Sequence, residues 1–153
     1  MAGLINRGAN VNASDNRGAT ALHLSVVTGH LEAVKLLVNA PELDVNAQDG
    51  SGDTALHEAV AAAPPAANGC NSITEILCSL DGLDLTRVNV KGFNVLHYAA
   101  VKGNAYVVDA ILTRSTTNSL PLAVNDKKAS DGYTALHLAV LNGHLEVCTT
   151  PKI

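Results

Sequence analysis

The chain has 153 residues and a formal net charge of −4 at pH 7, with 47% hydrophobic but only 3% aromatic residues. A modest negative charge without a run of Lys or Arg argues against binding to nucleic acid or to an anionic membrane surface. We expect Lys127-Lys128, the densest basic spot, to be a solvated pair in a loop. The sequence shows no secretory signal and no apolar segment long enough to insert into a membrane.

Cysteine usage and the missing catalytic motifs narrow the classes of function further. The three cysteines, Cys70, Cys78 and Cys148, are odd in number and form no Cys-x-x-Cys pair, which favours reduced thiols in the cytoplasm or the nucleus. His57-Glu58 begins like a metalloprotease helix, but Ala61 stands where the second zinc-binding histidine would be. We therefore expect a non-enzymatic chain that uses no cofactor, no metal and no small-molecule substrate.

A tetrapeptide recurs along the chain. Thr-Ala-Leu-His occurs at Thr20–His23, Thr54–His57 and Thr134–His137, and a near copy lies between the second and the third at Asn94–His97. The four histidines are 34, 40 and 40 residues apart, and each follows a glycine by five residues. A single catalytic centre has no use for one signature at four regular positions, whereas a stack of repeated structural units requires it.

The full pattern, Gly-x-Thr-Ala-Leu-His-x-Ala/Ser-x-x-x-Gly-His, resembles the ankyrin repeat, most closely in Gly18–Glu32 and Gly132–Glu146. The resemblance implies an all-α repeat solenoid of helix-turn-helix units with short β-hairpin fingers. We expect a right-handed stack of three to four such units, truncated at both ends. Ankyrin repeats usually carry proline after the threonine, and the Ala or Val found here leaves the fold intact because proline only presets the backbone.

In chain order, residues 1–13 are expected to form a partial repeat, which is the end of a second helix and its exit loop. Residues 14–48 are expected to form the first whole unit. In that unit Thr20 is placed to cap a short first helix, and Gly29 to end it in the left-handed conformation. The apolar spacing over 31–38 then predicts an amphipathic second helix.

The later units carry insertions. Residues 49–88 are expected to form a unit with a loop between its helices, because Pro64-Pro65 forbids another helical turn. Residues 89–128 are expected to form a third unit with a long polar exit loop over Thr113–Lys128. Residues 129–153 are expected to form a truncated unit, whose second helix stops after about one turn because the chain runs into a proline.

Both ends are expected to expose the Leu and Val faces of the terminal units, although solenoid ends normally carry polar capping faces. At about 25 cal/mol per Å² of apolar surface, losing one covered flank of each terminal unit costs several kcal/mol. That loss is comparable to the whole stability of a small domain. We therefore interpret the chain as a fragment, a truncated gene model or a splice form of a longer protein.

The four aligned histidines suggest a metal site, but geometry favours a structural role. Neighbouring units stack at roughly 10 Å, the width of a helix layer, whereas zinc lies about 2 Å from its nitrogen ligands. Two stacked histidines therefore cannot share one ion. The resemblance to ankyrin repeats implies that this histidine is buried at the junction of finger and helix, where it forms hydrogen bonds within and between units. We expect a structural role for His30 and His144 as well.

Residues 88–144 resemble the ankyrin region of a narrower family, the mind bomb E3 ubiquitin ligases. The agreement rests on the start Gly92-Phe93-Asn94, the junction Gly103-Asn104, the long exit and the restart Asp131-Gly132-Tyr133-Thr134. The resemblance implies a substrate- or adaptor-binding segment of a ligase that ubiquitinates ligands of the Notch receptor, with RING fingers that are not in this chain. The Pro-Pro insertion departs from the pattern, and no catalytic or zinc-binding residue of that family has a counterpart here.

Two other classes of function stay open at this point. One is a stand-alone ankyrin adaptor or inhibitor without an attached enzyme, for example one that masks a transcription factor. The other is a structural tether whose repeats only space other domains. All three classes share an ankyrin stack whose partners are other proteins.

Protein binding is expected through the finger tips and the exposed ends of the first helices. The candidate partner-binding residues are Asn16, Arg17, Ser51, Asp53, Lys91, Phe93, Lys102, Asp131 and Tyr133. Phe93 and Tyr133 are the strongest candidates, because aromatic anchors dominate many interfaces and these two occupy equivalent positions in adjacent fingers. The alternative is that both rings pack against the neighbouring finger.

Overall fold

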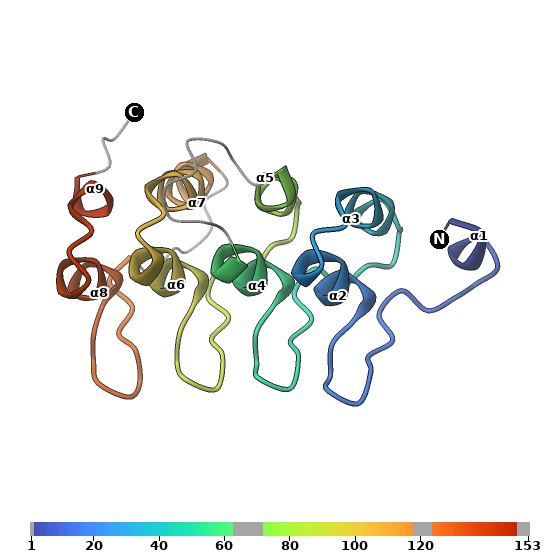
Figure 1. The fold of residues 1–153 in the computed structure, drawn as a ribbon, viewed down its shortest axis with the longest axis horizontal. Helices are drawn as coiled ribbons and strands as arrows, with labels where there is room; N and C mark the ends of the chain where they lie inside the picture. The colour runs from blue at the N-terminus through green and yellow to red at the C-terminus, as the bar shows by residue number, and fades with distance from the viewer. Residues whose placement is uncertain (1, 63–71, 118–123, 150–153) are drawn as a thin grey trace.

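The elements stack as a row of similar units. The computed structural model describes residues 2–62, 72–117 and 124–149. Its helices are α1 (Ala2–Ile5), α2 (Ala21–Val27), α3 (Leu31–Val38), α4 (Ala55–Ala62), α5 (Ser72–Cys78), α6 (Val95–Lys102), α7 (Ala105–Thr117), α8 (Ala135–Leu141) and α9 (Leu145–Cys148). In Figure 1 the first helices of the units, α2, α4, α6 and α8, lie side by side in one layer, and the second helices form another layer beside it. A finger precedes each first helix and projects away from the second layer (Figure 1). This is the all-α repeat solenoid that the sequence predicted.

Each first helix begins with the same reciprocal pair of hydrogen bonds. The Oδ1 atom of Asn94 accepts the backbone N–H of His97 at 2.9 Å, and the backbone N–H of Asn94 donates to Nδ1 of the His97 ring at 3.2 Å. Thr54 and Thr134 make the same two bonds, with the hydroxyl oxygen in place of Oδ1. A reciprocal capping box of this kind is also present at Thr20. The predicted caps are confirmed, and the histidine of the motif is part of each.

Glycines end the first helices, as predicted. Gly29, Gly103 and Gly143 have φ angles of 71°, 71° and 73°, in the left-handed region that is common just after a helix. The expected exit loop from Thr113 is wrong in its first part, because α7 continues as a helix to Thr117. The stretch from Thr113 to Thr117 contains neither glycine nor proline, so its backbone has no reason to leave the helix.

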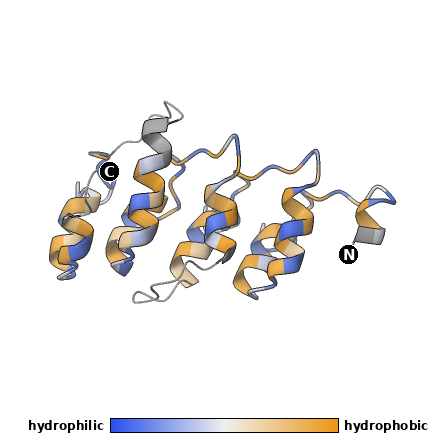
Figure 2. Cartoon of the chain, turned by 90° about the horizontal axis from the view of Figure 1, so that it is seen from above, coloured by the Kyte–Doolittle hydropathy of each residue, from blue (hydrophilic) through white to orange (hydrophobic). Residues whose placement is uncertain are grey.

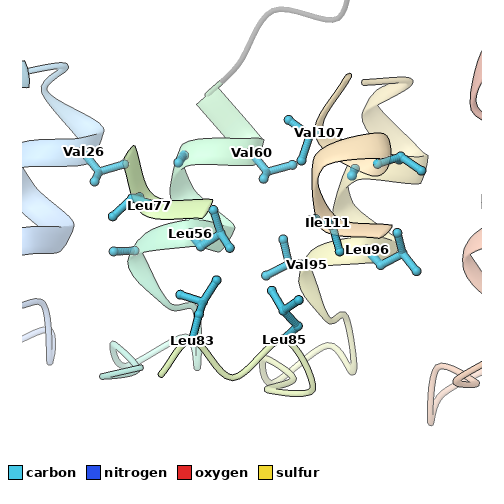
Figure 3. Packing of buried hydrophobic residues seen from close by; sticks show 14 of the residues in the cluster. Val26, Leu56, Val60, Leu77, Leu83, Leu85, Val95, Leu96, Val107 and Ile111 are labelled. Atoms are coloured by element: carbon cyan, nitrogen blue, oxygen red, sulfur yellow. The ribbon is translucent and has the colours of Figure 1, made fainter. Parts of the chain in front are cut away.

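The core is a continuous apolar layer between the two helix layers and the exit loops. Figure 3 shows Leu56 and Val60 of α4 near Leu77 of α5, with Leu83 of the following loop beneath them. Small side chains such as Ala59, which is 0% exposed, let neighbouring helices approach closely. Apolar residues, orange in Figure 2, recur on every helix, including those at the two ends of the row.

One side chain closes the hairpin in each of the first three fingers. Asp15, Asp49 and Asn89 occupy the same position, and the Oδ1 atom of each accepts the backbone N–H groups two and four residues later at 2.8–3.0 Å. The fourth finger has Ala129 at this position. Isolated bridges close the first two fingers, and no extended strand forms among the described residues. The expected β-hairpin fingers are therefore hairpin loops held by both backbone and side-chain bonds.

Neighbouring fingers are also bonded to each other through their backbones. The N–H of Gly50 donates to the carbonyl oxygen of Arg17 at 2.7 Å, and the next pair of fingers repeats this bond at 2.9 Å. The close approach leaves no room for a side chain, because a Cβ atom on Gly52 would lie 2.9 Å from the Cα atom of Asn89. Gly52 also has a φ of 75°, so backbone conformation and packing both require glycine there.

The helices at the two ends of the row are short. α1 and α9 are each four residues long, and α9 stops where the sequence predicted that its helix would stop. The Pro64-Pro65 insertion and Pro121 lie outside the described residues. The boundaries of the individual units remain a prediction.

Gly52→Ala should destabilise the fold more than Gly82→Ala. The two glycines have φ angles of 75° and 74°, so each substitution adds backbone strain of about 1–2 kcal/mol. Gly52 also faces the neighbouring finger, where the extra methyl group should cost about 1–3 kcal/mol more. A Cβ atom on Gly82 would have nothing within 4 Å. Chemical denaturation of both variants checks the order, and equal losses would contradict close packing of the fingers.

Candidate protein-binding surface

The histidine of the motif joins each unit to the next. The Nε2 atoms of His23 and His57 lie 3.1 and 3.2 Å from a backbone carbonyl oxygen of the following finger, and the Nε2 atom of His97 lies 3.0 Å from the carbonyl oxygen of Asp126, in the exit loop that leads to the fourth finger. Because Nδ1 accepts the N–H of the capping residue, it carries no proton, and Nε2 must be the donor. Both ring nitrogens are therefore engaged, which is the structural role that the sequence favoured over a metal site. No cluster of three or more His, Cys, Asp or Glu suited to a metal ion occurs within the described part of the chain.

A second set of bonds joins successive exit loops. The Nδ2 atom of Asn12 donates to the carbonyl oxygen of Glu42 at 2.6 Å, and its Oδ1 atom accepts the N–H of Asp44 at 2.8 Å. Asn46 makes the same two bonds to the following loop at 2.7 and 2.8 Å. These bonds and the histidine bonds fix the spacing of the first three units, so their fingers are presented as one row.

Most of the predicted binding residues lie on the fingers with exposed side chains. The exposed ones are Asn16, Arg17, Ser51, Lys91, Asp131 and Tyr133, and the half-buried ones are Asp53, Phe93 and Lys102. The N–H of Val90 donates to the carbonyl oxygen of Ser51 at 2.9 Å, which brings the second and third tips together. Figure 1 shows all four fingers projecting on the same side. That these residues contact a partner remains a prediction.

Phe93 is not an exposed anchor. Its ring lies 5.3 Å from the ring of Tyr98, and the Nζ atom of Lys128, from the next finger, lies 4.4 Å from the centre of the Phe93 ring. The same Nζ atom donates to Oδ2 of Asp131 at 2.7 Å, and this bond is the largest cause that lowers the pKa of the Asp131 carboxyl. The expectation of a solvated Lys128 is wrong, because its side chain is only 13% exposed. Phe93 follows the alternative in which the ring packs against the neighbouring finger.

Tyr133 behaves differently from Phe93. Its ring stacks on His137 of its own unit, with the ring centres 5.9 Å apart and the planes at 24°, and the residue is 39% exposed. The two aromatic residues therefore do not form the continuous exposed patch that their equivalent sequence positions suggested. Lys128 covers Phe93, whereas Tyr133 lies in the last finger of the described row.

Sequence reasoning missed a polar cluster at the base of the second and third fingers. Asn89, only 6% exposed, donates through Nδ2 to Oδ1 of Asp53 at 2.8 Å and to the hydroxyl oxygen of Tyr98 at 3.2 Å. Burial, followed by the charge of Asp53, raises the pKa of Tyr98, and the same two causes raise the pKa of Glu58. The available signal was an asparagine where the two preceding fingers have aspartate. Asparagine keeps the acceptor and adds a donor that reaches the Asp53 carboxylate of the preceding finger.

The buried histidines work in their neutral form. Burial is the largest cause that lowers the pKa of His57, and the charge of Asp53 and the bond to the carbonyl oxygen of Phe93 oppose it. Burial likewise lowers the pKa of His97, and the bond to the carbonyl oxygen of Asp126 opposes it. A charged ring would lose the Nδ1 acceptor on which the helix cap depends.

Comparison with known proteins gives the family. Residues 4–59 match the family described as ankyrin repeats (many copies), and residues 61–150 match the one described as ankyrin repeats (3 copies). The chain belongs to the ankyrin-repeat family, and it is a protein-interaction scaffold of that kind.

Two curated relatives are ankyrin repeat domain-containing protein 63 of Homo sapiens and its counterpart in Mus musculus. Each is 38% identical to this chain over 114 residues. The alignments cover 71% of this chain and 27% of each relative, so the chain spans about a quarter of their length.

In the described part of the chain, no helix has the length and apolar character needed to cross a membrane.

Acid should destabilise the fold through His57 and His97. Their pKa values are lowered in the folded state, so the unfolded chain binds protons first as the pH falls below about 6.5. Stability is therefore complete above that value and declines as the pH falls toward the lower folded pKa. The melting temperature should fall between about pH 7.5 and pH 5, and it should fall less steeply in the double variant His57→Gln/His97→Gln.

The His30→Gln variant, at an exposed histidine, is the matched control for replacing a histidine with glutamine. Glu58 has the opposite effect on the stability of the fold at the acid end of this pH range. The pKa of its carboxyl is raised in the folded state, so proton binding favours the folded state. Glu58 is common to all the variants, so the difference between them isolates the histidines. Equal slopes for the parent and the double variant would contradict the neutral-histidine account.

Phe93→Ala should reduce the free energy of unfolding by about 2–3 kcal/mol, somewhat less than the loss of a fully buried aromatic ring. Tyr133→Ala should cost less than about 1 kcal/mol, because its ring is more exposed and packs within one unit. Thermal or chemical denaturation of the two variants measures both values. Similar small losses would mean that Phe93 is a surface ring after all.

Proposed function

We propose that the finger tips, together with the exposed ends of the first helices, form the surface through which this scaffold binds another protein. The observation that carries the proposal is the pair of backbone bonds from Gly50 to Arg17 and from Val90 to Ser51. These bonds hold three tips at a fixed spacing, while the side chains of Arg17, Ser51 and Lys91 stay exposed. A preorganised array loses little conformational entropy on binding, which favours affinity.

The tips combine positive charge with an apolar contact. Val90 is 74% exposed, beside the exposed Lys91 in the third finger, and Arg17 lies on the tip of the first. The acidic side chains of Asp53 and Glu58 are half-buried at the base of the fingers, and the exposed carboxylates of Asp15 and Asp131 accept hydrogen bonds within their own fingers. A partner segment with an apolar side chain among acidic ones would complement the tips, because matched charges set the orientation of a complex.

A photo-crosslinking amino acid in place of Lys91 tests this surface. Exposed to a cell extract, it should form discrete adducts that mass spectrometry can identify, because the third finger lies in the proposed interface. The same amino acid in place of Lys35 is the matched control. Lys35 is also an exposed lysine, but it lies on α3 in the layer of second helices.

Competition makes the crosslinking result specific. Excess parent chain should suppress the adducts of the Lys91 probe, whereas an excess of the variant Arg17→Glu/Val90→Asp should suppress them much less. Identical adducts from the Lys91 and Lys35 probes would contradict the proposal. Equal suppression by both competitors would contradict it as well, because binding would not depend on the tips.

A finer proposal is that the scaffold is the substrate- or adaptor-binding segment of a mind bomb-like E3 ubiquitin ligase that acts in Notch signalling. Its support is the agreement of residues 88–144 with that family's ankyrin region in the order and spacing of motifs. The alternative is a stand-alone ankyrin adaptor or inhibitor with no enzyme attached. We place either one in the cytoplasm, with the nucleus as a second compartment, on the basis of an odd number of cysteines and the absence of Cys-x-x-Cys pairs.

Sequencing the full transcript that carries this chain separates the two alternatives. Further ankyrin units followed by Cys-x-x-Cys pairs with zinc-binding spacing would support the ligase. A stop codon directly after polar capping residues would contradict the ligase and support the adaptor.

A further inference from the structure

The tips of the first three fingers present three polar side chains in the same register. Arg17, Ser51 and Lys91 each stand directly before the glycine of positive φ in their own finger. The N–H of Gly50 donates to the carbonyl oxygen of Arg17 at 2.7 Å, and the carbonyl oxygen of Ser51 accepts the N–H of Val90 at 2.9 Å. The finger of Ser51 is therefore fixed between the fingers of the two cations.

The polar groups of these three side chains are unused. Within the described part of the chain, the Arg17 guanidinium, the Ser51 hydroxyl and the Lys91 ammonium group make no hydrogen bond and no ion pair. Three other cations are each paired with a carboxylate at 2.7–2.9 Å, namely Lys35, Arg87 and Lys128. The tips thus keep two cations and a hydroxyl group available as hydrogen-bond donors.

The carboxylates of the same fingers are already engaged. The Oδ1 atoms of Asp15 and Asp49 each accept two backbone N–H groups of their own hairpin. The Oδ1 atom of Asp53 accepts Nδ2 of Asn89 at 2.8 Å. The negative charge of the fingers is therefore used to hold the hairpins, whereas the positive charge of the tips stays exposed and unpaired.

The surroundings of the Ser51 hydroxyl leave room for a bulky anion. Gly50 and Gly52 flank Ser51, and a Cβ atom on either glycine would lie 2.7 or 2.9 Å from a backbone atom of a neighbouring finger. Both positions must therefore stay without a side chain, so neither chain neighbour of Ser51 shields its hydroxyl. The flexible stems of Arg17 and Lys91 allow their charged ends to approach this group from either side.

A phosphate monoester matches these donors better than a carboxylate does. It carries a charge of about −1.5 to −2 at pH 7, and its three terminal oxygens are strong acceptors. A guanidinium fork, an ammonium group and a hydroxyl group can each bond to a different oxygen of one phosphate. A carboxylate has a single negative charge and two oxygens, so it would leave one of the two cations without a matching charge.

The fourth tip argues against a nucleic acid as the source of the phosphate. Asp131 occupies the position that Arg17, Ser51 and Lys91 have in the other tips. The bond from Lys128 is the largest cause that lowers the pKa of the Asp131 carboxyl, so this carboxyl stays ionised. A polyanion needs a continuous positive surface, whereas the free cations here suit one phosphate group.

We propose that the partner of the finger tips carries a phosphorylated serine or threonine, whose phosphate docks over Ser51 between Arg17 and Lys91. This inference rests on the proposed function, because it names the chemical group that the tips recognise. Arg17 and Lys91 supply the charge, and the Ser51 hydroxyl donates to the third oxygen. The phosphate bridges three fingers, so the partner loses contacts to all three when it is dephosphorylated.

Titration with N-acetyl-O-phosphoserine amide, followed by the amide chemical shifts of the chain, tests the site without the partner. Saturable shifts should appear at Ser51 and its neighbours in the tips. N-acetylserine amide should cause none, and N-acetylglutamate amide should bind more weakly. The variant Arg17→Gln/Lys91→Gln should bind phosphoserine about 5- to 30-fold more weakly, because two exposed ion pairs are lost.

The matched control for this titration is Lys35→Gln/Lys127→Gln, which removes two exposed lysines outside the tips and should bind like the parent. Both double variants should fold, because their substituted side chains are exposed, and circular dichroism checks this. Equal binding by the two double variants would overturn the proposal. A glutamate probe that binds as tightly as phosphoserine would also overturn it, as would an oligonucleotide that shifts the same amides at lower concentration.

A cell extract tests the same site with the whole partner. A photo-crosslinking amino acid in place of Asn16, which is exposed on the first tip, leaves all three donors intact. Its adducts should fall at least about fivefold after the extract is treated with a phosphatase, and they should persist when the phosphatase is inhibited. Equal adducts from treated and untreated extracts would overturn this inference alone. Adducts absent from both would overturn the proposed function together with it.

Discussion

The structure depends on one buried imidazole ring repeated along the chain. In each of the first three units its Nδ1 atom accepts the N–H that starts the first helix. Its Nε2 atom donates to the following finger at His23 and His57, and to the exit loop that leads to the fourth finger at His97. One neutral side chain thus ties a helix cap, a finger and a neighbouring unit together. Burial keeps the ring neutral where it lowers the pKa, as at His57 and His97. A change of charge would therefore break local and long-range bonds at the same time.

The last junction is built with different bonds from the earlier ones. Ala129 replaces the aspartate or asparagine that closes the other fingers, and Thr86 stands where Asn12 and Asn46 join the exit loops. Among the described residues, no backbone bond joins the third finger tip to the fourth. Side chains replace these bonds: Lys128 lies on the ring of Phe93, and the Nε2 atom of His144 lies 3.0 Å from the carbonyl oxygen of Val101 in α6. His144 thus has the structural role that the sequence suggested.

The stack separates two kinds of surface. The finger tips carry polar and charged side chains on a backbone fixed by hydrogen bonds, which suits recognition of a partner without loss of stability. The flanks of the units carry aliphatic side chains that are buried at the internal junctions, which removes apolar surface from water. A solenoid has both kinds of surface because each unit packs against a neighbouring unit on its two flanks, while its finger remains exposed to solvent.

The sequence by itself determined the features that are local or periodic. The repeated motif gave the number and order of the first helices, their caps and their glycine ends, because each depends on residues within a few positions of one another. The tertiary structure decided which equivalent ring is covered and what Lys128 does. Phe93 and Tyr133 occupy the same position in their fingers, yet within the described part of the chain a lysine of the following finger lies only over Phe93. That contact joins residues 35 positions apart, and only the stacking of neighbouring fingers brings them together.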